Sequence, residues 1–430
     1  MRIAIIGGGV GGLTLALALR QRGLQPDIYE QASELAEIGA AVALSANATR
    51  ELTRLGLLDQ IAAVSTEPSE LIYRSWRDGS RIAAHKVHLD LRYQRECGAP
   101  YFGIHRADLQ RILSGGLASD RSDWKRSERE SAGQRLADPY RPDHSQGDMG
   151  LGGGGLHLGH QLANLAQRDR TMVLTFANGK SVEADLVIGA DGVRSMVRRF
   201  ITGSDDTVYS GTSAYRGIVP VERLPTLPDP QAIQFWMGPD AHLLHYAIGG
   251  NGESVNFFAV IERPKPWPHP DKWLDPIEPG EAVRAFAGWN QAVIEMVAQS
   301  LSVRWGLFGV RPLLHWSRGA AVLIGDAAHG MLPHHGQGAN TTIEDAITLA
   351  ELLPGASADG LAPMLAHYQS LRRARTRKIQ RSSWVTNAAL HLPDGPALAE
   401  RDRRVARFPE EFGWIHRFDA LQTVRDAAYA

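Results

Sequence analysis

Residues 3–12 read IAIIGGGVGG, a short apolar run that leads directly into a glycine-rich turn. The run Ile3–Ile6 is typical of a buried strand. Helical spacing follows from Leu13 to Arg20, and a second apolar run extends from Leu24 to Tyr29. A strand, a glycine turn, a helix and a strand in this order predict the opening of a parallel βαβ unit.

The glycines of this turn have the spacing that a dinucleotide requires. Gly7, Gly9 and Gly12 give the pattern G-x-G-x-x-G, and Glu30 closes the second strand. Such glycines let the backbone approach a pyrophosphate at a helix N-terminus, and the acid can accept hydrogen bonds from ribose hydroxyls. This context disfavours the alternative, a merely flexible turn. We therefore assign six residues to dinucleotide binding: Gly7, Gly9, Gly11, Gly12, Glu30 and Gln31.

Two further motifs follow apolar strands later in the chain. Asp191-Gly192 ends the run that begins at Leu186, and Asp326 lies in LIGDAAH, residues 323–329. An aspartate at a strand end can accept a hydrogen bond from a ribityl hydroxyl. The combination of three motifs indicates a flavin more specifically than the first motif does by itself.

The loop LPHHGQGAN, residues 332–340, follows the third motif. Its two glycines allow backbone N–H groups to come close to a flat ring. Thr341 and Glu344 have the T-x-x-E spacing of a capping box, which predicts a helix start at this point. The positive end of that helix is expected to stabilise negative charge on a reduced flavin.

These motifs, in this order and spacing, resemble those of the flavoprotein aromatic hydroxylases, the family typified by p-hydroxybenzoate and salicylate hydroxylases. HRADL, residues 105–109, is similar to the family's H-R-x-x-L segment, and the tail 401–420 is most similar to the salicylate hydroxylase branch. The resemblance implies FAD as cofactor, NADH or NADPH as reductant, O2, and a small aromatic substrate. It places seven further residues on the cofactor: Arg106, Asp191, Asp326, Gly336, Gly338, Ala339 and Asn340.

The expected fold is α/β, a Rossmann-like FAD-binding domain with an inserted antiparallel β-sheet substrate domain and C-terminal helices. Short strands are predicted at 233–236, 243–248 and 255–261, and Asn178-Gly179 suits a tight hairpin turn. The expected boundaries are 1–72, 104–202 and 306–360 for the FAD-binding domain, 73–103 and 203–305 for the substrate domain, and 361–430 for the helical region.

One segment departs from this pattern. Ala118 to Gly155 is rich in Arg, Asp, Ser and Gly and has few aliphatic residues. Such a composition buries too little apolar surface to offset its ordering entropy. We expect a disordered surface insertion at 118–155, with an artefact of the gene sequence as the alternative.

The resemblance places the substrate between the antiparallel sheet and the flavin. On a strand, His242 and Tyr246 share one face and His245 lies on the other. Related phenol hydroxylases use a histidine at the place of His242, where an imidazole can take the phenol proton. A structural role is the alternative for His242.

Four more residues are expected at the substrate. Pro333 and His334 are predicted beside the flavin, with a solvent-facing histidine as the alternative for His334. Tyr215 and Arg216 lie in SAYRG, residues 213–217, which resembles the strand that enters the family's substrate domain. Arg216 is expected to hold a carboxylate with two hydrogen bonds, or else to form a structural pair.

Charge and composition exclude several classes of protein. Lys+Arg number 46 and Asp+Glu 47, so neither nucleic acid nor an anionic membrane surface is expected as a partner. The basic run 372–378 is interpreted as a solvated helix face. The 16 histidines show no zinc spacing, so no metal site is expected.

The lone cysteine, Cys97, fits a reducing compartment, and no apolar run approaches the ~20 residues that span a bilayer. The glycine-rich N-terminus does not fit a signal peptide. We expect a cytoplasmic monomer or homodimer.

The leading hypothesis is a monooxygenase that converts salicylate to catechol with loss of CO2. A second hypothesis is a monooxygenase of the same fold that acts on another hydroxylated aromatic or heteroaromatic ring. A third is a flavin-binding protein without turnover. Since no second glycine fingerprint appears, NAD(P)H is expected to bind transiently.

Overall fold

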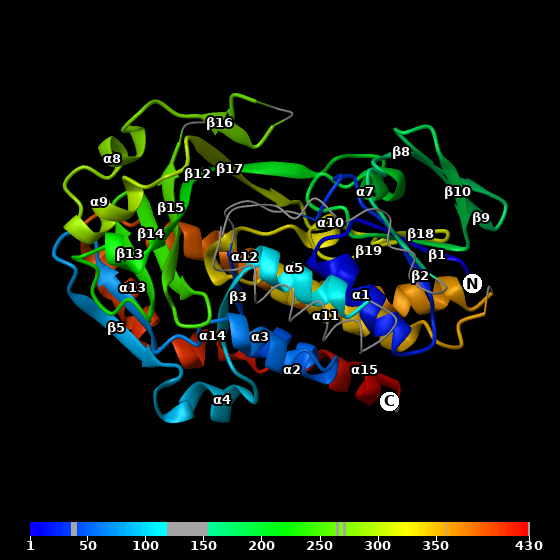
Figure 1. The fold of residues 1–430 in the computed structure, drawn as a ribbon, viewed down its shortest axis with the longest axis horizontal. Helices are drawn as coiled ribbons and strands as arrows, with labels where there is room; N and C mark the ends of the chain where they lie inside the picture. The colour runs from blue at the N-terminus through cyan, green and yellow to red at the C-terminus, as the bar shows by residue number, and fades with distance from the viewer. Residues whose placement is uncertain (36–40, 118–153, 264–265, 270–271, 358, 429–430) are drawn as a thin grey trace, which may run out of the picture.

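Two sheets make up most of the structure, a parallel sheet at the right of Figure 1 and a larger mixed sheet at the left. This computed structural model describes residues 1–35, 41–117, 154–263, 266–269, 272–357 and 359–428. The predicted α/β class, with a Rossmann-like domain, a sheet domain and C-terminal helices, is confirmed.

The parallel sheet contains the βαβ unit that the first residues predict. Its strands, in spatial order, are β18 (Ser317–Arg318), β19 (Ala321–Leu323), β11 (Leu186–Gly189), β1 (Ile3–Ile6), β2 (Pro26–Tyr29) and β7 (Leu156–His157). All neighbours run parallel except β18 and β19. Helix α1 (Val10–Arg20) connects β1 to β2.

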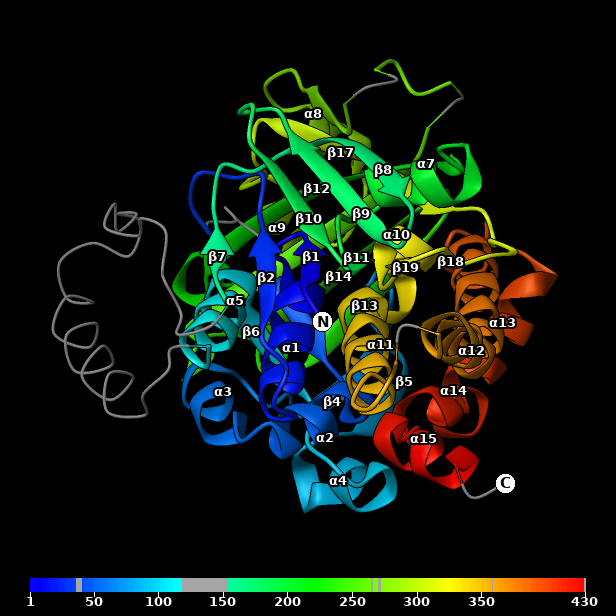
Figure 2. The same ribbon diagram turned by 90° about the vertical axis from the view of Figure 1, so that its right-hand side faces the viewer.

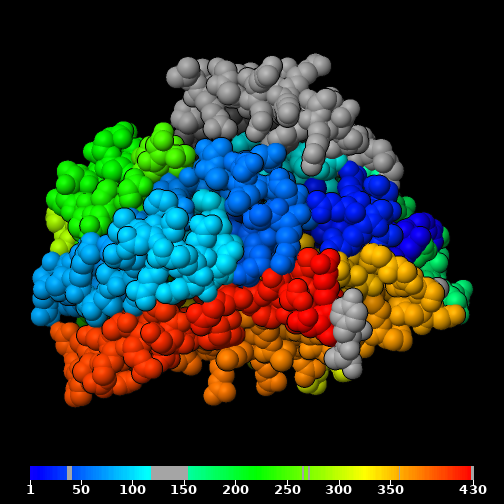
Figure 3. Space-filling view, turned by 90° about the horizontal axis from the view of Figure 1, so that it is seen from below, coloured from blue at the N-terminus to red at the C-terminus, as the bar shows by residue number. Residues whose placement is uncertain are grey.

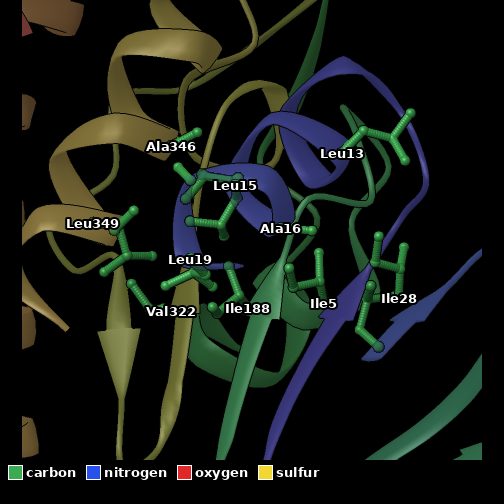
Figure 4. Packing of buried hydrophobic residues seen from close by; sticks show 14 of the residues in the cluster. Ile5, Leu13, Leu15, Ala16, Leu19, Ile28, Ile188, Val322, Ala346 and Leu349 are labelled. Carbon is green, nitrogen blue, oxygen red and sulfur yellow. The ribbon is translucent and has the colours of Figure 1, made fainter. Parts of the chain in front are cut away.

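Helix α1 is apolar on nearly all sides because it is packed between the sheet and helix α11 (Gly338–Leu352). Figure 4 shows Leu19 of α1 beside Ile188 and Val322 of the sheet and Leu349 of α11. All four side chains are fully buried. Burying one such side chain contributes about 1.5–3 kcal/mol, so this contact fixes α1 and its N-terminal turn on the sheet.

The second sheet has eight strands. The sequence predicted an antiparallel sheet, but one of its strand pairs is parallel. In spatial order they are β16 (Leu274–Pro276), β17 (Val303–Val310), β12 (Thr207–Pro220), β15 (Ser254–Glu262), β14 (Ala241–Ile248), β13 (Ile233–Gly238), β4 (Glu70–Ser75) and β5 (Arg81–Lys86). Strand β4 pairs with β13 in parallel. It comes from a segment far earlier in the chain, so no hairpin forces the antiparallel direction.

One face of this sheet is closed by its own helices, α8 (Glu281–Ala285) and α9 (Gln291–Val297), through a cluster that includes Trp236 and Phe257. The opposite face is turned toward the parallel-sheet domain and the C-terminal helices (Figure 1). Which face a strand residue occupies therefore decides whether it reaches the space between the domains.

Two small sheets and several short helices complete the two domains. The predicted Asn178-Gly179 hairpin is confirmed between β9 (Thr171–Phe176) and β10 (Ser181–Ala184), with Gly179 at φ 83°. Strand β8 (Leu162–Arg168) pairs with β9, and β3 (Ala41–Leu44) pairs with β6 (Phe102–His105). The helices are α2 (Ala46–Arg54), α3 (Leu58–Val64), α4 (Arg92–Cys97), α5 (Arg106–Gly115), α7 (Met196–Thr202) and α10 (Asp326–His329).

The C-terminal helices lie along one side of the molecule, at the right of Figure 2. They are α12 (Leu361–Leu390), α13 (Pro396–Ala406), α14 (Phe408–His416) and α15 (Ala420–Ala428). Helices α14 and α15 contact α2, and Figure 3 shows this red segment along the blue N-terminal part of the chain. The last two helices thus pack against the N-terminal part of the chain.

The interpretation of the basic run 372–378 as a solvated face is wrong for two of its arginines. Arg372 is 1% exposed and donates to Asp345 at 2.7 Å and to Glu344 at 2.5 Å. Arg375 also binds Glu344, at 2.7 Å. The physical reason is the pair of carboxylates on α11, which are buried and therefore require cations from the facing helix.

The predicted capping box is also wrong. Helix α11 begins at Gly338, so Thr341 lies inside its first turn and its hydroxyl donates to the carbonyl of Gln337 at 2.7 Å. Glu344 faces the arginines of α12 instead of the helix start. Two buried charge-assisted contacts outweigh the one backbone N–H that a cap offers.

Most of the predicted disordered insertion, residues 118–153, lies outside the described residues. Its last two residues are described and run beside β2. The N–H of Gly155 donates to Asp27 at 2.9 Å, and the N–H of Ile28 donates to the Gly155 carbonyl at 2.7 Å. Within the described ranges, no helix is both long and apolar enough to cross a membrane.

Candidate active site

The sequence motifs meet at one edge of the parallel sheet. Strands β1, β2, β11 and β19 all end there, and Gly7, Glu30, Asp191 and Asp326 follow directly or closely after them. The carboxyl edge of a parallel sheet is where such folds bind ligands. The structure thus brings together motifs that are more than a hundred residues apart in the chain.

The turn glycines have two different roles. Gly7 has φ 108°, and a Cβ there would collide with the carbonyl of Ala190, while a Cβ on Gly12 would collide with the carbonyl of Gly7. A Cβ on Gly11 would collide with Thr342 of α11. These three glycines permit close packing within the protein, whereas a Cβ on Gly9 would meet no protein atom within 4 Å and would point into open space.

A groove of about 1040 Å³ follows the carboxyl edge. Glu30 is held at its rim because its carboxylate accepts the N–H groups of Gly8 at 2.6 Å and Ala32 at 2.8 Å. This carboxylate keeps further lone pairs for ribose hydroxyls. The predicted cofactor residues that line the groove are Gly7, Gly9, Glu30, Gln31, Arg106, Asp191 and Asp326.

The groove continues into a cavity of about 340 Å³ between the two domains. Arg106, Asp326 and Pro333 line both spaces. Arg216 also lines both spaces, and the second cavity adds further predicted residues from the turn, the loop and the sheet: Gly11, Gly336, Gly338, Ala339 and Tyr246. A long groove that leads to a narrow, glycine-lined cavity suits a dinucleotide with a flat ring at one end.

Two predicted cofactor residues, Asn340 and Asp191, make hydrogen bonds within the protein. The Asn340 side chain is fully buried; it accepts the N–H of Ser45 at 2.9 Å and donates to the carbonyl of Ala43 at 2.8 Å. It therefore positions the loop. Asp191 accepts the N–H of Met196 at 2.8 Å at the start of α7, and burial raises the pKa of its carboxyl.

A third cavity, of about 440 Å³, lies beyond the loop 333–336 and is here called the aromatic chamber. Ala43, Leu244, Tyr246 and Gly336 line both the chamber and the second cavity, so the two spaces adjoin. The volume is in the range of small-molecule sites. Six aromatic side chains in its wall are Tyr73, Tyr93, Tyr101, Phe235, Tyr246 and Phe408.

Sequence reasoning missed most of this chamber. Phe408 and His416 come from α14, and Tyr93 comes from α4. The Tyr93 hydroxyl is hydrogen-bonded to His416 Nδ1 at 2.6 Å. Charged groups of both signs lie at the wall: Arg92 is paired with Glu96 at 2.7 Å, and Arg417 offers charge for a carboxylate. No spacing in the sequence connects these two segments, because they meet only through tertiary packing.

Three histidines lie at the junction of the chamber and the sheet. His334 lines the chamber, and its ring stands edge-on to that of His242 with centroids 5.1 Å apart. His242 Nδ1 is 2.7 Å from Nε2 of His391, at the end of α12. Burial lowers the pKa of His242 and His334 well below the usual value and that of His391 to about 4. All three are neutral at pH 7 and able to accept a proton.

The strand alternation predicted for β14 agrees with the lining residues: Tyr246 faces the cavities, and His245 is buried without a hydrogen bond to any described residue. The assignment of Tyr215 to the substrate is wrong. Its hydroxyl donates to Glu281 at 2.8 Å in the cluster under α8 and α9. Arg216, the next residue, points the other way and lines the cavity with its guanidinium 4.7 Å from the ring centroid of Phe258. Adjacent residues of a strand cannot both face the same side.

Within the described residues, no group of three or more His, Cys, Asp and Glu is placed to hold a metal ion.

Two family models match the chain, an FAD binding domain over residues 156–383 and an NAD(P)-binding Rossmann-like domain over residues 5–40. The 3-amino-4-hydroxybenzoate 2-monooxygenase PtmB3 of Streptomyces platensis is 37% identical over 97% of this chain and 96% of its own. Salicylate hydroxylase of Pseudomonas putida is 31% identical over 97% and 93%. A solved salicylate hydroxylase substrate complex has a TM-score of 0.77 at 26% identity and covers 99% of this chain and 97% of that one.

Proposed function

The chain belongs to the family of FAD-dependent aromatic monooxygenases, and we propose that it hydroxylates a small aromatic acid that carries a free phenolic hydroxyl. The observation that carries the proposal is the aromatic chamber, which adjoins the second cavity and has neutral histidines at the junction. Its walls suit a flat ring, and Arg417 suits a carboxylate.

FAD fits the residues present. The open side of Gly9 and the free N–H groups of the first turn of α1 suit a pyrophosphate, and Glu30 suits a ribose. Asp326 is exposed and lines both cavities, so its carboxylate suits a ribityl hydroxyl. Bound FAD supplies the transfer of electrons from NAD(P)H and the delivery of one oxygen atom of O2 to the ring.

Gly9→Val should yield folded protein that binds FAD weakly. The added side chain meets no protein atom but fills the space of the cofactor, and a forced displacement costs about 1–3 kcal/mol, or about 5- to 150-fold in Kd. Fluorescence titration of the apoprotein with FAD measures this change. Gly12→Val is the matched control: it collides inside the protein, so it should lower Tm, whereas Gly9→Val should not. Unchanged FAD affinity in Gly9→Val would contradict the assigned groove.

The chain's own groups then hold and activate the substrate. We assign to Tyr246 and Pro333 the positioning of the ring against the flavin, because both line the cavity between the domains. His242 and His334 accept the phenolic proton, which makes the ring electron-rich. Arg216 is close to the same space and provides positive charge there.

The first candidate substrate is 3-amino-4-hydroxybenzoate. The support is the relative of that name, which aligns with nearly the whole chain at 37% identity. The test is NADH and NADPH oxidation by the FAD-loaded protein with this compound, together with mass analysis of the product. The expected result is strong stimulation and a product heavier by one oxygen atom. Stimulated oxidation of NADH or NADPH without an oxygenated product would show that the protein does not hydroxylate this compound.

Salicylate is the second candidate, supported by the solved salicylate hydroxylase of the same fold at 26% identity. The same assay distinguishes it, because salicylate turnover would release CO2 and form catechol. Bound FAD with no stimulation by any phenolic acid would leave the second hypothesis, a heteroaromatic or other hydroxylated ring. If no such ring stimulates NAD(P)H oxidation either, the third hypothesis remains, a flavin-binding protein without turnover.

A further inference from the structure

A continuous series of polar groups leads from the histidine junction to the protein surface. His242 Nδ1 is 2.7 Å from His391 Nε2, and His391 Nδ1 is 3.3 Å from a carboxylate oxygen of Glu262. The His242 and His391 side chains are enclosed, whereas the Glu262 side chain is 51% exposed. The three groups come from β14, from the end of α12 and from β15, and are called the relay here.

The hydrogen-bond partners fix the tautomer of each ring. A carboxylate can only accept, so His391 Nδ1 carries the hydrogen that is donated to Glu262. The Nε2 of neutral His391 is then an acceptor, and His242 Nδ1 must donate to it. The lone pair of neutral His242 is then on Nε2, the ring nitrogen that does not contact His391.

The chamber end of this series is His334. Its ring stands edge-on to His242, and neither of its nitrogens has a hydrogen-bond partner of good geometry within the described part of the chain, although the nearby Asn387 side chain acts to raise its pKa. His334 is 3% exposed and lines the chamber. Such a buried, unsatisfied ring is costly unless a ligand or a moving proton uses it.

We propose that the phenolic proton of the substrate leaves the chamber through His334 and His242 and reaches solvent through His391 and Glu262. This inference rests on the proposed function, since it requires a phenol in the chamber. The O–H bond of the substrate breaks and leaves its electron pair on the phenolate oxygen. His334 takes the phenolic proton on one ring nitrogen and releases the proton of the other to His242 Nε2. His242 releases its Nδ1 proton to His391 Nε2, and His391 releases its Nδ1 proton to Glu262, from which it passes to water. No ring gains net charge once the transfer is complete.

A second exposed carboxylate, Asp240, acts on the relay. Asp240, in the turn between β13 and β14, donates its backbone N–H to the carbonyl of His391 at 3.1 Å, and its charge acts on that ring. His335 is the remaining titratable group next to His334. Within the described residues, the Asp240 side chain makes no hydrogen bond to the relay, which makes it a matched control for charge.

The test measures ionisation of bound substrate in the oxidised, FAD-loaded protein without NADH. Stopped-flow absorbance of 3-amino-4-hydroxybenzoate reports the phenolate as it forms. Glu262→Gln and His391→Gln should each slow this step by about tenfold or more, with little change in the Kd of the substrate. The same variants should shift the pH profile of the step, because the carboxylate no longer takes the proton. Asp240→Asn removes the same charge at a neighbouring position. Because Asp240 acts on His391 and Glu262 only through its charge, this variant should change the rate far less than Glu262→Gln does; at φ 57° asparagine is well tolerated there.

The outcomes are distinct. Wild-type rates in both relay variants would overturn the relay and leave the proposed hydroxylation intact. An equal loss in Asp240→Asn would also overturn it, since charge alone would then explain the effect. A weaker Kd and lower Tm in His391→Gln, with a normal ionisation rate in Glu262→Gln, would mean that His391 is structural. Failure of the wild type to ionise and hydroxylate any phenol would instead reject the proposed function.

Discussion

Replacing Arg372 with methionine should lower the free energy of unfolding by about 3–5 kcal/mol, the cost of leaving buried carboxylates without their partner. Arg372 lies between Glu344 and Asp345, and all three side chains are at most 1% exposed. Asp345 also accepts the N–H of Gly325 at 2.9 Å, next to Asp326 in the cofactor groove. The change should therefore weaken FAD binding as well as stability. Chemical denaturation of the apoprotein and FAD titration measure the two effects.

Arg377→Met is the matched control, because Arg377 is exposed on the same helix and its loss should change stability by less than about 0.5 kcal/mol. Equal effects of the two substitutions would contradict the importance of the buried network.

The effect of Arg372→Met should depend on pH in a defined direction. Burial raises the pKa of Glu344 and Asp345, but the nearby cations outweigh burial and the net pKa of each is lowered. A carboxyl whose pKa is lowered in the folded state contributes stability above its unfolded pKa, about 4, and loses it as the pH falls through the folded value. In the variant, burial without Arg372 favours the protonated form. The gap between wild type and variant should thus be largest near pH 7 and narrow toward pH 4.

The residues assigned to the cofactor could be expected to meet along one groove, because local chemistry determines where they lie. The turn at Gly7–Gly12 and the acid at Glu30 belong to one βαβ unit, and parallel strands necessarily bring their carboxyl ends to one edge. Asp326 follows a strand of the same sheet, so its place could be predicted once the sheet was expected. In each case the strand that precedes the motif determines where its residues lie.

The errors have a common physical origin: the contact lies between segments that are distant in sequence. The T-x-x-E spacing predicted that Glu344 caps its own helix. Its partner in the structure is Arg372, which lies on another helix and is not indicated by any local spacing. Tyr215 was grouped with Arg216, although alternation along a strand separates them. His391 gave no signal at all, since only the end of α12 brings it to His242. Tertiary contacts of this kind follow from packing, which periodicity does not reveal.

His242→Asn should reduce kcat for hydroxylation by about 10²- to 10⁴-fold, the usual contribution of a positioned proton acceptor. Burial, then His391 and His334, lower the pKa of His242, so the base is neutral and ready at pH 7. The wild-type rate should accordingly fall only well below pH 6.5, whereas the variant should regain activity at high pH, where the substrate ionises in solution. Steady-state kinetics across pH, with product analysis, measures both features.

His245→Asn separates this chemistry from packing. His245 is on the same strand and is equally buried, but it faces away from the chamber, and burial lowers its pKa to about 3. Loss of a buried imidazole should destabilise both variants to a similar degree, while kcat should fall in His242→Asn alone. A comparable fall in both, with no recovery at high pH, would assign His242 a structural role and leave His334 as the acceptor.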